Sequence, residues 1–260
     1  MIGAWLAMQF IGLQAAEIIA HRGASHDAPE NTLASMKLAW EQKADAIELD
    51  LWLSKDGRLV VMHDGDTKRV GGPERKLTEQ TWDELKQLDV GSWKHASFKG
   101  ERIPTLESIL ATIPSGRRAF LEIKCGPEIL DELERVLQQA HRPPEQLVVI
   151  SFSLKVLERS KKRFPQFDHY LLHDYKKDSK TERYPELAPL LENAKEAGLD
   201  GLGLQFKWPM NEAFVKELNS AGLKLFVWTV NDPEVARKMF ALGVDAIGTD
   251  RPGWLREQLK

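Results

Sequence analysis

Charged side chains stand two positions apart at two places in the sequence. Glu48 and Asp50 lie in the run AIELDLWL, and Glu122 and Lys124 lie in AFLEIK. If both runs are strands, residues at i and i+2 share a face, so each pair points to one side of the sheet. Three carboxylates that meet in an apolar site repel one another and raise each other's pKa unless a cation neutralises them. The spacing therefore predicts a metal site made by Glu48, Asp50 and Glu122.

Oxygen ligands restrict the choice of metal. All-oxygen ligation favours Mg²⁺ or Ca²⁺ over zinc, and Mg²⁺ typically keeps waters and substrate phosphate oxygens beside a few carboxylates. We therefore expect one divalent cation, Mg²⁺ or Ca²⁺, and the sequence does not decide between them. The alternative for these acids is a set of structural ion pairs with Arg22 and Lys124.

Two histidines follow strand-like runs elsewhere in the chain. His21 stands beside Arg22 after IIA, and His63 follows LVVM. Imidazole titrates near neutral pH, so one ring can deprotonate an attacking oxygen while the other protonates a leaving alkoxide. Arg22 offers a planar fork, and Lys124 a point charge, to the oxygens of a phosphorane-like transition state. The residue types together predict a metal-dependent phosphodiester hydrolase.

Nine short apolar runs are the strands that must position these groups. The second and third are joined only by SKDGR, whose Asp56-Gly57 is typical of a hairpin, so we expect them to be antiparallel. The hairpin would bring His63 back opposite Leu49 and Asp50. The other eight strands are separated by helical segments, which is the count of a (β/α)8 TIM-type barrel, whose functional groups gather at strand C-termini. The expected strands are 18–22, 46–53, 59–63, 119–124, 147–151, 169–172, 201–205, 225–229 and 245–248.

Helix boundary signals support the same α/β repeat. Gly198, Gly222 and Gly243 each follow a helical run and precede a strand, where a left-handed residue ends the helix. Ser153 can cap the next run, and Asp232 stands before Pro233, which suits a first helical turn. The interval of residues 64–118 is the longest between barrel strands. We expect it to be an inserted subdomain or lid over the mouth, with helical runs at 78–88 and 105–113.

Composition narrows the classes of partner. The 260 residues carry a net charge of −3, with no basic stripe for nucleic acid and no acidic tail. The single cysteine, Cys125, excludes an intrachain disulfide and a cysteine-based zinc cluster. Residues 1–16 are uncharged and end in small residues, as in a short secretory signal, which would place the protein outside the cytoplasm; the alternative is an apolar segment under the barrel of a cytoplasmic protein. No later run reaches the length of a membrane span. The sequence predicts no oligomeric state.

The ordered motifs of residues 18–260 resemble those of the glycerophosphodiester phosphodiesterase family. They are AHRGASHDAPENTLASM, DAIELDLWLSKDGRLVVMHD, FKGERIPTLESIL, LEIK, FVWTVND and GVDAIGTDRP. The resemblance implies a (β/α)8-like barrel with a subdomain inserted after the HD motif, so that residues 17–260 form one domain. It also implies hydrolysis of a glycerophosphodiester to sn-glycerol 3-phosphate and an alcohol.

By position in these motifs, the resemblance assigns a role to each candidate. The catalytic histidines fall on His21 and His63, and the metal ligands on Glu48, Asp50 and Glu122. Arg22 corresponds to the arginine that contacts phosphate. The resemblance also matches four further residues, namely Lys124 in LEIK, Glu30 and Asn31 in PENT, and Trp228 in VWTVN. Asn31 and Thr32 could instead only start a helix, and Trp228 could belong to the barrel core rather than wall the glycerol pocket.

Several alternatives stay open at this point. Attack by water and attack by the glycerol 2-hydroxyl fit equally, and no segment fixes the head group, so we expect broad specificity. A lysophospholipase D would need an apolar channel at the mouth. The aromatics that could line one are Trp52, Trp82, Trp93, Phe98, Phe206 and Trp208. A barrel that binds phosphoesters without turnover is the alternative from another class, and loss of a histidine or an acid would be its signature.

Overall fold

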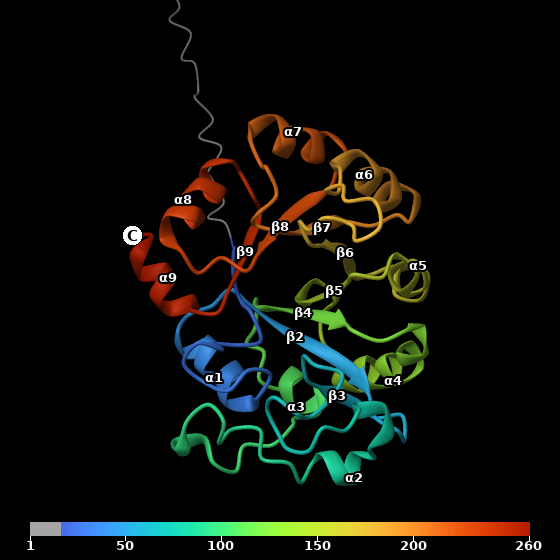
Figure 1. Ribbon diagram of the computed structural model, residues 1–260, viewed down its shortest axis with the longest axis vertical. Helices are drawn as coiled ribbons and strands as arrows, with labels where there is room; N and C mark the ends of the chain where they lie inside the picture. The colour runs from blue at the N-terminus through green and yellow to red at the C-terminus, as the bar shows by residue number, and fades with distance from the viewer. Residues whose placement is uncertain (1–16) are drawn as a thin grey trace, which may run out of the picture.

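The computed structural model describes residues 17–260. The expected secretory segment, residues 1–16, lies outside the described residues. Eight parallel strands form the centre, and their hydrogen-bonded order is β1-β9-β8-β7-β6-β5-β4-β2, with β1 paired to β2 so that the barrel is closed. The predicted (β/α)8 barrel is confirmed (Figure 1). The strands are β1 (Glu17–Ala20), β2 (Ala46–Leu53), β4 (Arg118–Ile123), β5 (Leu147–Ser151), β6 (Asp168–His173), β7 (Gly201–Gln205), β8 (Lys224–Trp228) and β9 (Ala246–Thr249).

The ninth strand, β3 (Leu59–Val61), is the return arm of the predicted hairpin. It pairs antiparallel with β2, with Leu51 opposite Val61 and Leu53 opposite Leu59. Just beyond this ladder the Met62 amide donates to the Asp50 carbonyl at 3.1 Å. Continuing that register places His63 across from Leu49, as the hairpin predicted.

Eight helices cover the outside of the strands, one after each barrel strand (Figure 1). Ser153 and Asp232 cap their helices as predicted, through hydrogen bonds from backbone amides to the side-chain oxygen. Gly198, Gly222 and Gly243 all have a positive φ, between 64° and 83°. The helices are α1 (Leu33–Glu41), α3 (Leu106–Leu110), α4 (Leu130–Ala140), α5 (Leu154–Arg163), α6 (Leu187–Glu196), α7 (Glu212–Ser220), α8 (Pro233–Ala241) and α9 (Pro252–Gln258).

The long interval after β3 is a small subdomain beside β2 and β3. Its short elements are the 3-10 helix Leu77–Glu79, α2 (Trp82–Leu85) and the 3-10 helix Ala96–Phe98, and it has its own apolar core of Val60, Met62, Val70, Leu77, Leu85, Val90 and Ile103. The last part of the expected insertion, α3, contacts α1 and α4 and therefore fills a position in the ring of barrel helices.

Side chains alternate along the barrel strands between two apolar layers. Leu49, Leu51, Leu121 and Ile123 belong to the large core between strands and helices, as the two-residue period predicts. A second core fills the barrel interior with Ile19, Ala46, Phe120, Val148, Ile150, Tyr170, Leu172, Phe226 and Ala246. The acids of β2 and β4 sit on the interior face beyond this plug, toward the strand C-termini. Among the described residues, no helix is long and apolar enough to cross a bilayer.

Acids also mark the N-terminal ends of three strands. Asp45, Asp200 and Asp245 stand just before β2, β7 and β9, and each makes the same reciprocal contact with a neighbouring strand. The amides of Ile18, His169 and Leu225 donate to their carboxylates at 3.0, 2.8 and 2.8 Å. Their own amides donate back to the carbonyls of the same three partners, each at 2.9 Å. These acids therefore link adjacent strands at the N-terminal ends of the strands, which we call the closed end of the barrel.

Candidate active site

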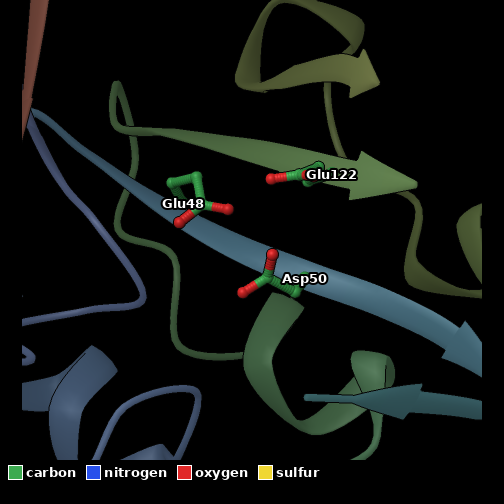
Figure 2. A group of neighbouring side chains, drawn as sticks. All are labelled: Glu48, Asp50 and Glu122. Carbon is green, nitrogen blue, oxygen red and sulfur yellow. The ribbon is translucent and has the colours of Figure 1, made fainter. Parts of the chain in front are cut away.

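Three carboxylates converge on the interior face of β2 and β4 (Figure 2). Glu48 and Asp50 come from β2 and Glu122 from β4, where Asp50 and Glu122 are paired in the parallel ladder. One oxygen of each lies within 4.8 Å of the others, and all three residues are buried, at 8% exposed or less. The strand period and the parallel register together bring the three predicted metal ligands into one group.

These carboxylates hold more negative charge than their neighbours neutralise. Burial first, and then the charges of Asp50 and Glu122, raise the pKa of Glu48 well above its ordinary value. Burial and Asp50 raise the pKa of Glu122 to about 7 against the opposing effect of Lys124. Glu48 Oε1 is buried with no donor beside it, and the buried Asp50 Oδ1 and Glu122 Oε1 meet only the Lys124 ammonium group. Buried oxygens of this kind are costly unless paired, so the set fits a hard divalent cation.

Arg22 and Lys124 lie against the acids on two sides. Arg22 Nε is 3.5 Å from Asp50 Oδ2. Lys124 Nζ is 2.8 Å from Glu122 Oε1 and 3.3 Å from Asp50 Oδ1. The alternative of structural ion pairs is thus partly realised, but Glu48 receives only a backbone amide, that of Arg22 at 2.8 Å. With all three acids ionised, the two side-chain cations beside them would leave one negative charge unpaired.

The HRG motif supplies an unusual backbone at the end of β1. Arg22 has a φ of 58°, a left-handed conformation that costs a non-glycine residue of order 1 kcal/mol. Gly23 follows with a φ of 78°, and a Cβ there would lie 2.5 Å from Ser35 Oγ, so only glycine fits. The Arg22 carbonyl accepts from the Asn31 amide and from Ser35 Oγ, both at 3.0 Å. The turn is therefore held from the start of α1 while its amide faces Glu48.

The PENT residues support the acids rather than only starting a helix. Asn31 is buried, and its side-chain Nδ2 donates to Asp50 Oδ2 at 2.7 Å while its Oδ1 accepts from the Asp50 amide at 3.2 Å. Glu30 Oε1 accepts from Arg22 NH1 at 2.9 Å. Thr32, not Asn31, caps α1. Asn31 thus orients one acid, and Glu30 orients the neighbouring guanidinium.

His21 is paired with an acid that directly follows the last strand of the barrel. Its Nδ1 lies 2.7 Å from Asp250 Oδ1, which also accepts from Ser25 Oγ at 3.0 Å. Asn231 Nδ2 donates to Asp250 Oδ2 at 2.6 Å. Burial opposes the charge on Asp250, yet the contacts with His21 and the two donors hold its pKa below its ordinary value. The carboxylate at Nδ1 fixes the ring and leaves Nε2 for proton transfer.

His63 has a matching pair with its sequence neighbour. Its Nδ1 lies 2.6 Å from Asp64 Oδ1, and Arg69 Nε donates to Asp64 Oδ2 at 2.6 Å. Although burial opposes it, the hydrogen bonds from Arg69 and His63 lower the pKa of Asp64 to about 2. Burial lowers the pKa of His63 itself, helped by Arg22 and Lys124 and opposed by Asp50. Both histidines therefore have a carboxylate behind Nδ1.

A cavity of about 300 Å³ opens onto these groups at the strand C-termini. Its lining includes His21, His63, Arg22, Lys124, Glu48 and Glu122 on one side. Ile150, Phe152, Leu172, Phe226 and Trp228 form an apolar wall from β5 to β8, and Asp174, Lys176 and Gln205 add polar groups. Trp228 lines the cavity and also packs against the interior core, so the residue is both part of the cavity wall and part of the barrel packing.

The lining of the cavity bears on two points that the sequence left open, namely where the insertion lies and whether aromatics form a channel. Of the residues that the structure describes, none between 64 and 121 lines the cavity, so the inserted segment flanks the mouth rather than covering it. None of the six aromatics proposed for a lipid channel lines it either, because most pack elsewhere: Trp52 and Trp82 in the insertion core, and Phe206 and Trp208 in or against the outer core. The exposed aromatic at the mouth is Phe152, whose ring lies 5.6 Å from that of Trp228.

Sequence reasoning missed the partners of the histidines. Asp250 could have been found, because it follows the last strand in GTDRP and a closed barrel puts that strand beside β1. Asp64 directly follows His63 in the HD motif. Arg69 gave no comparable signal, since its contact with the site depends on the path of an irregular loop.

The chain is similar to known proteins along nearly all of its length. It matches the model of the "Glycerophosphoryl diester phosphodiesterase family" over residues 21–254. A glycerophosphodiester phosphodiesterase from Caldanaerobacter subterraneus is 37% identical over 256 residues, covering 90% of this chain and 94% of that protein. Another from Bacillus subtilis is 31% identical, covering 90% and 83%. The structure of a phosphodiesterase from Oleispira antarctica, in complex with the product sn-glycerol-3-phosphate, has a TM-score of 0.83 and 31% identity, covering 94% and 96%.

Proposed function

This chain belongs to the glycerophosphoryl diester phosphodiesterase family, and from that membership and the geometry of the site we propose that it hydrolyses glycerophosphodiesters to sn-glycerol 3-phosphate and an alcohol. That it is an enzyme of this class follows from its homologues. The products, the ligand set and the histidine roles are the proposal, and the observation that carries it is the convergence of three acids and two carboxylate-backed histidines on one cavity. The product complex of the Oleispira antarctica phosphodiesterase supports the choice of product.

In the proposed reaction the two histidines exchange protons with the substrate. One Nε2 accepts the proton of the attacking oxygen, a bond forms from that oxygen to phosphorus, and the bond to the leaving alcohol breaks. The other Nε2 donates its proton to the leaving oxygen, so the alcohol departs neutral. When the attacking oxygen is the glycerol 2-hydroxyl, a cyclic phosphate forms and water opens it in a second, equivalent step. Both routes use the same pair.

The cations of the chain bind and stabilise the phosphoryl group in this scheme. Arg22 and Lys124 stand beside the acids, where their donors face phosphate oxygens whose charge grows in the transition state. Glu48, Asp50 and Glu122 would hold one divalent cation, either Mg²⁺ or Ca²⁺, which supplies Lewis-acid polarisation of a phosphoryl oxygen when bound. Asn31 and Glu30 keep Asp50 and Arg22 in place.

The opposite wall suits the rest of the substrate. Ile150, Phe152, Leu172, Phe226 and Trp228 give an apolar surface, with a few polar groups beside it. We propose that the glycerol carbons pack on this wall and that the leaving alcohol lies toward solvent. A cavity of about 300 Å³ is at the small end for ligand sites, which favours a deacylated substrate over a lipid with an acyl chain.

Replacement of each histidine tests the proposal. His21→Ala and His63→Ala should each lower the kcat for glycerophosphocholine by about 10² to 10⁴-fold, because each removes a general acid or base. His95→Ala is the matched control, since His95 lies at an exposed position of the insertion. The assay measures released sn-glycerol 3-phosphate, and circular dichroism confirms folding. Wild-type turnover in both active-site variants would overturn the assigned roles.

A further inference from the structure

Arg69, from the loop after His63, contacts two carboxylates that each support a different part of the site. Its Nε donates to Asp64 Oδ2 at 2.6 Å. Its NH1 and NH2 donate to Glu30 Oε2 and Oε1 at 2.7 and 2.8 Å. One planar guanidinium thus uses three donors on two acids that are 34 positions apart in sequence.

Through Asp64, Arg69 is connected to His63, which is a proposed catalytic group. Asp64 uses its other oxygen, Oδ1, for His63 Nδ1 at 2.6 Å. With Arg69 on one oxygen and the histidine on the other, the carboxylate has little freedom to rotate, and the ring direction is set with it. Fixing the partner of a ring nitrogen is how proteins choose the orientation and tautomer of an imidazole.

Through Glu30, Arg69 is connected to Arg22, the proposed phosphate-binding residue. Glu30 Oε1 also accepts from Arg22 NH1 at 2.9 Å, so this half-buried acid lies between two guanidinium groups. Burial opposes its charge, but the hydrogen bonds and charges of Arg69 and Arg22 lower the pKa of Glu30 below its ordinary value. The forked contact with Arg69 fixes the Glu30 carboxylate, and Glu30 in turn holds Arg22 through one hydrogen bond.

We propose that Arg69 is a positioning residue that sets Arg22 and His63 relative to each other, through Glu30 and Asp64. The inference rests on the proposed function of those two residues. Arg22 follows β1 and His63 follows β3, two strands that both pair with β2, and Arg69 joins the two residues without lining the cavity. Displacements of about 1 Å in such groups typically cost 10²-fold in rate.

The experiment compares Arg69 variants with an arginine of the same segment that does not contact the site's supports. Arg75 is similarly exposed and pairs with Glu84 within the insertion. Arg69→Ala should lower kcat by about 10 to 100-fold, and Arg69→Lys should recover little of it, because one ammonium cannot bind both acids as a fork. Arg75→Ala should keep wild-type kcat. Thermal unfolding shows whether each variant is folded, and Arg69→Lys serves if the alanine variant is not.

A double-mutant cycle separates positioning from general support. If Arg69 acts through Asp64, the variant carrying Arg69→Ala with Asp64→Asn should lose much less kcat than the product of the two single losses. Multiplicative losses would overturn the proposal. A second cycle, which combines Arg69→Ala with Glu30→Gln, tests in the same way whether Arg69 acts on Arg22 through Glu30.

Affinity for inorganic phosphate gives a second readout that needs no turnover. Arg69→Ala should weaken phosphate binding by about tenfold through Arg22, while Arg75→Ala should not. Wild-type protein that hydrolyses no glycerophosphodiester would count against the proposed function, and phosphate affinity would still decide the role of Arg69. Full kcat and full phosphate affinity in Arg69→Ala would overturn this inference alone.

Discussion

Carboxylates mark both ends of the barrel strands, and the two sets have opposite surroundings. At the N-terminal ends, Asp45, Asp200 and Asp245 accept from backbone amides of neighbouring strands. Asp200 also accepts from Lys161 Nζ at 2.7 Å, and Asp45 from two arginines at 2.5 Å each. At the C-terminal ends, Glu48, Asp50 and Glu122 are more deeply buried; Glu48 Oε1 has no donor, and one oxygen each of Asp50 and Glu122 meets only the shared Lys124 ammonium group.

The difference separates structural acids from functional ones. A carboxylate whose lone pairs are filled by the fold contributes stability, whereas a buried carboxylate left short of donors is destabilising until something binds it. The acids at the closed end therefore hold neighbouring strands together. We infer that the acids at the open end, the C-terminal ends of the strands where the cavity lies, leave oxygens for a divalent cation. Residue type alone does not tell the two apart; position along the strand does.

The largest effect should come from Glu48→Gln at the open end. Removing one charge from the acidic group should lower kcat by about 10² to 10³-fold through lost cation binding, while the metal-free protein stays as stable or gains about 1 kcal/mol from reduced repulsion. Kinetics with Mg²⁺ or Ca²⁺ present measures the loss of kcat, and urea unfolding in EDTA measures the stability of the metal-free protein. Partial recovery of kcat by excess Mg²⁺ or Ca²⁺ is expected. Lower stability together with normal kcat would show that Glu48 is a structural acid, like those at the closed end.

A pH effect should appear at the closed end, where His169 is buried beside Asp200. Burial first, and then Lys161, lowers the pKa of His169 to about 4, below the unfolded value of 6.5. The neutral ring is thus favoured in the folded state, so this contribution is intact above pH 6.5 and is lost as pH falls toward 4. From pH 7 to 4.5, urea unfolding should show a loss of about 2 to 3 kcal/mol that is missing in His169→Gln. Parallel pH profiles for the two proteins would contradict this.

Divalent cation should stabilise the open end selectively. A cation that binds only the folded state adds about 2.7 kcal/mol at 100 times its Kd. The thermal midpoint of wild-type protein should therefore rise with Mg²⁺ or Ca²⁺, and the rise should shrink in Glu48→Gln but persist in Asp245→Ala, which alters the closed end. Equal rises in all three proteins would place the cation elsewhere.

A smaller effect should follow from Asp200→Ala. It removes the acceptor of the His169 amide and the partner of Lys161, which should cost about 2 kcal/mol of unfolding free energy with kcat unchanged. Asp245→Ala, which removes the acceptor of the Leu225 amide, should cost about 1 kcal/mol. A kcat loss comparable to that of Glu48→Gln would show that the closed end is not purely structural.

Much of the fold could be predicted because the governing signals are local. Alternation placed Glu48 and Asp50 on one face, Asp56-Gly57 fixed the hairpin, and eight β/α units fixed the barrel. The residues that escaped prediction are brought to the site by long-range closure or by irregular loops. Asp250 reaches His21 only because β9 pairs with β1, and Arg69 reaches Glu30 only through the folded insertion.

The lining of the cavity was harder to predict for a related reason. Phe152 and Phe226 belong to strands or loops with ordinary apolar patterns, and only the closed ring shows that they face the acids. Conversely, Trp208 looked available for a lipid channel but is buried in the outer core. The sequence alone therefore predicts the positions of aromatic residues poorly, whereas it predicts those of acids at strand ends well.

The most direct test of the account is release of sn-glycerol 3-phosphate from glycerophosphocholine by the purified protein, first with EDTA and then with Mg²⁺ or Ca²⁺ restored. The account predicts that EDTA abolishes release and that one of the two cations restores it. Release that persists undiminished in EDTA, or no release with either cation, would contradict a cation held by Glu48, Asp50 and Glu122 as the basis of glycerophosphodiester hydrolysis.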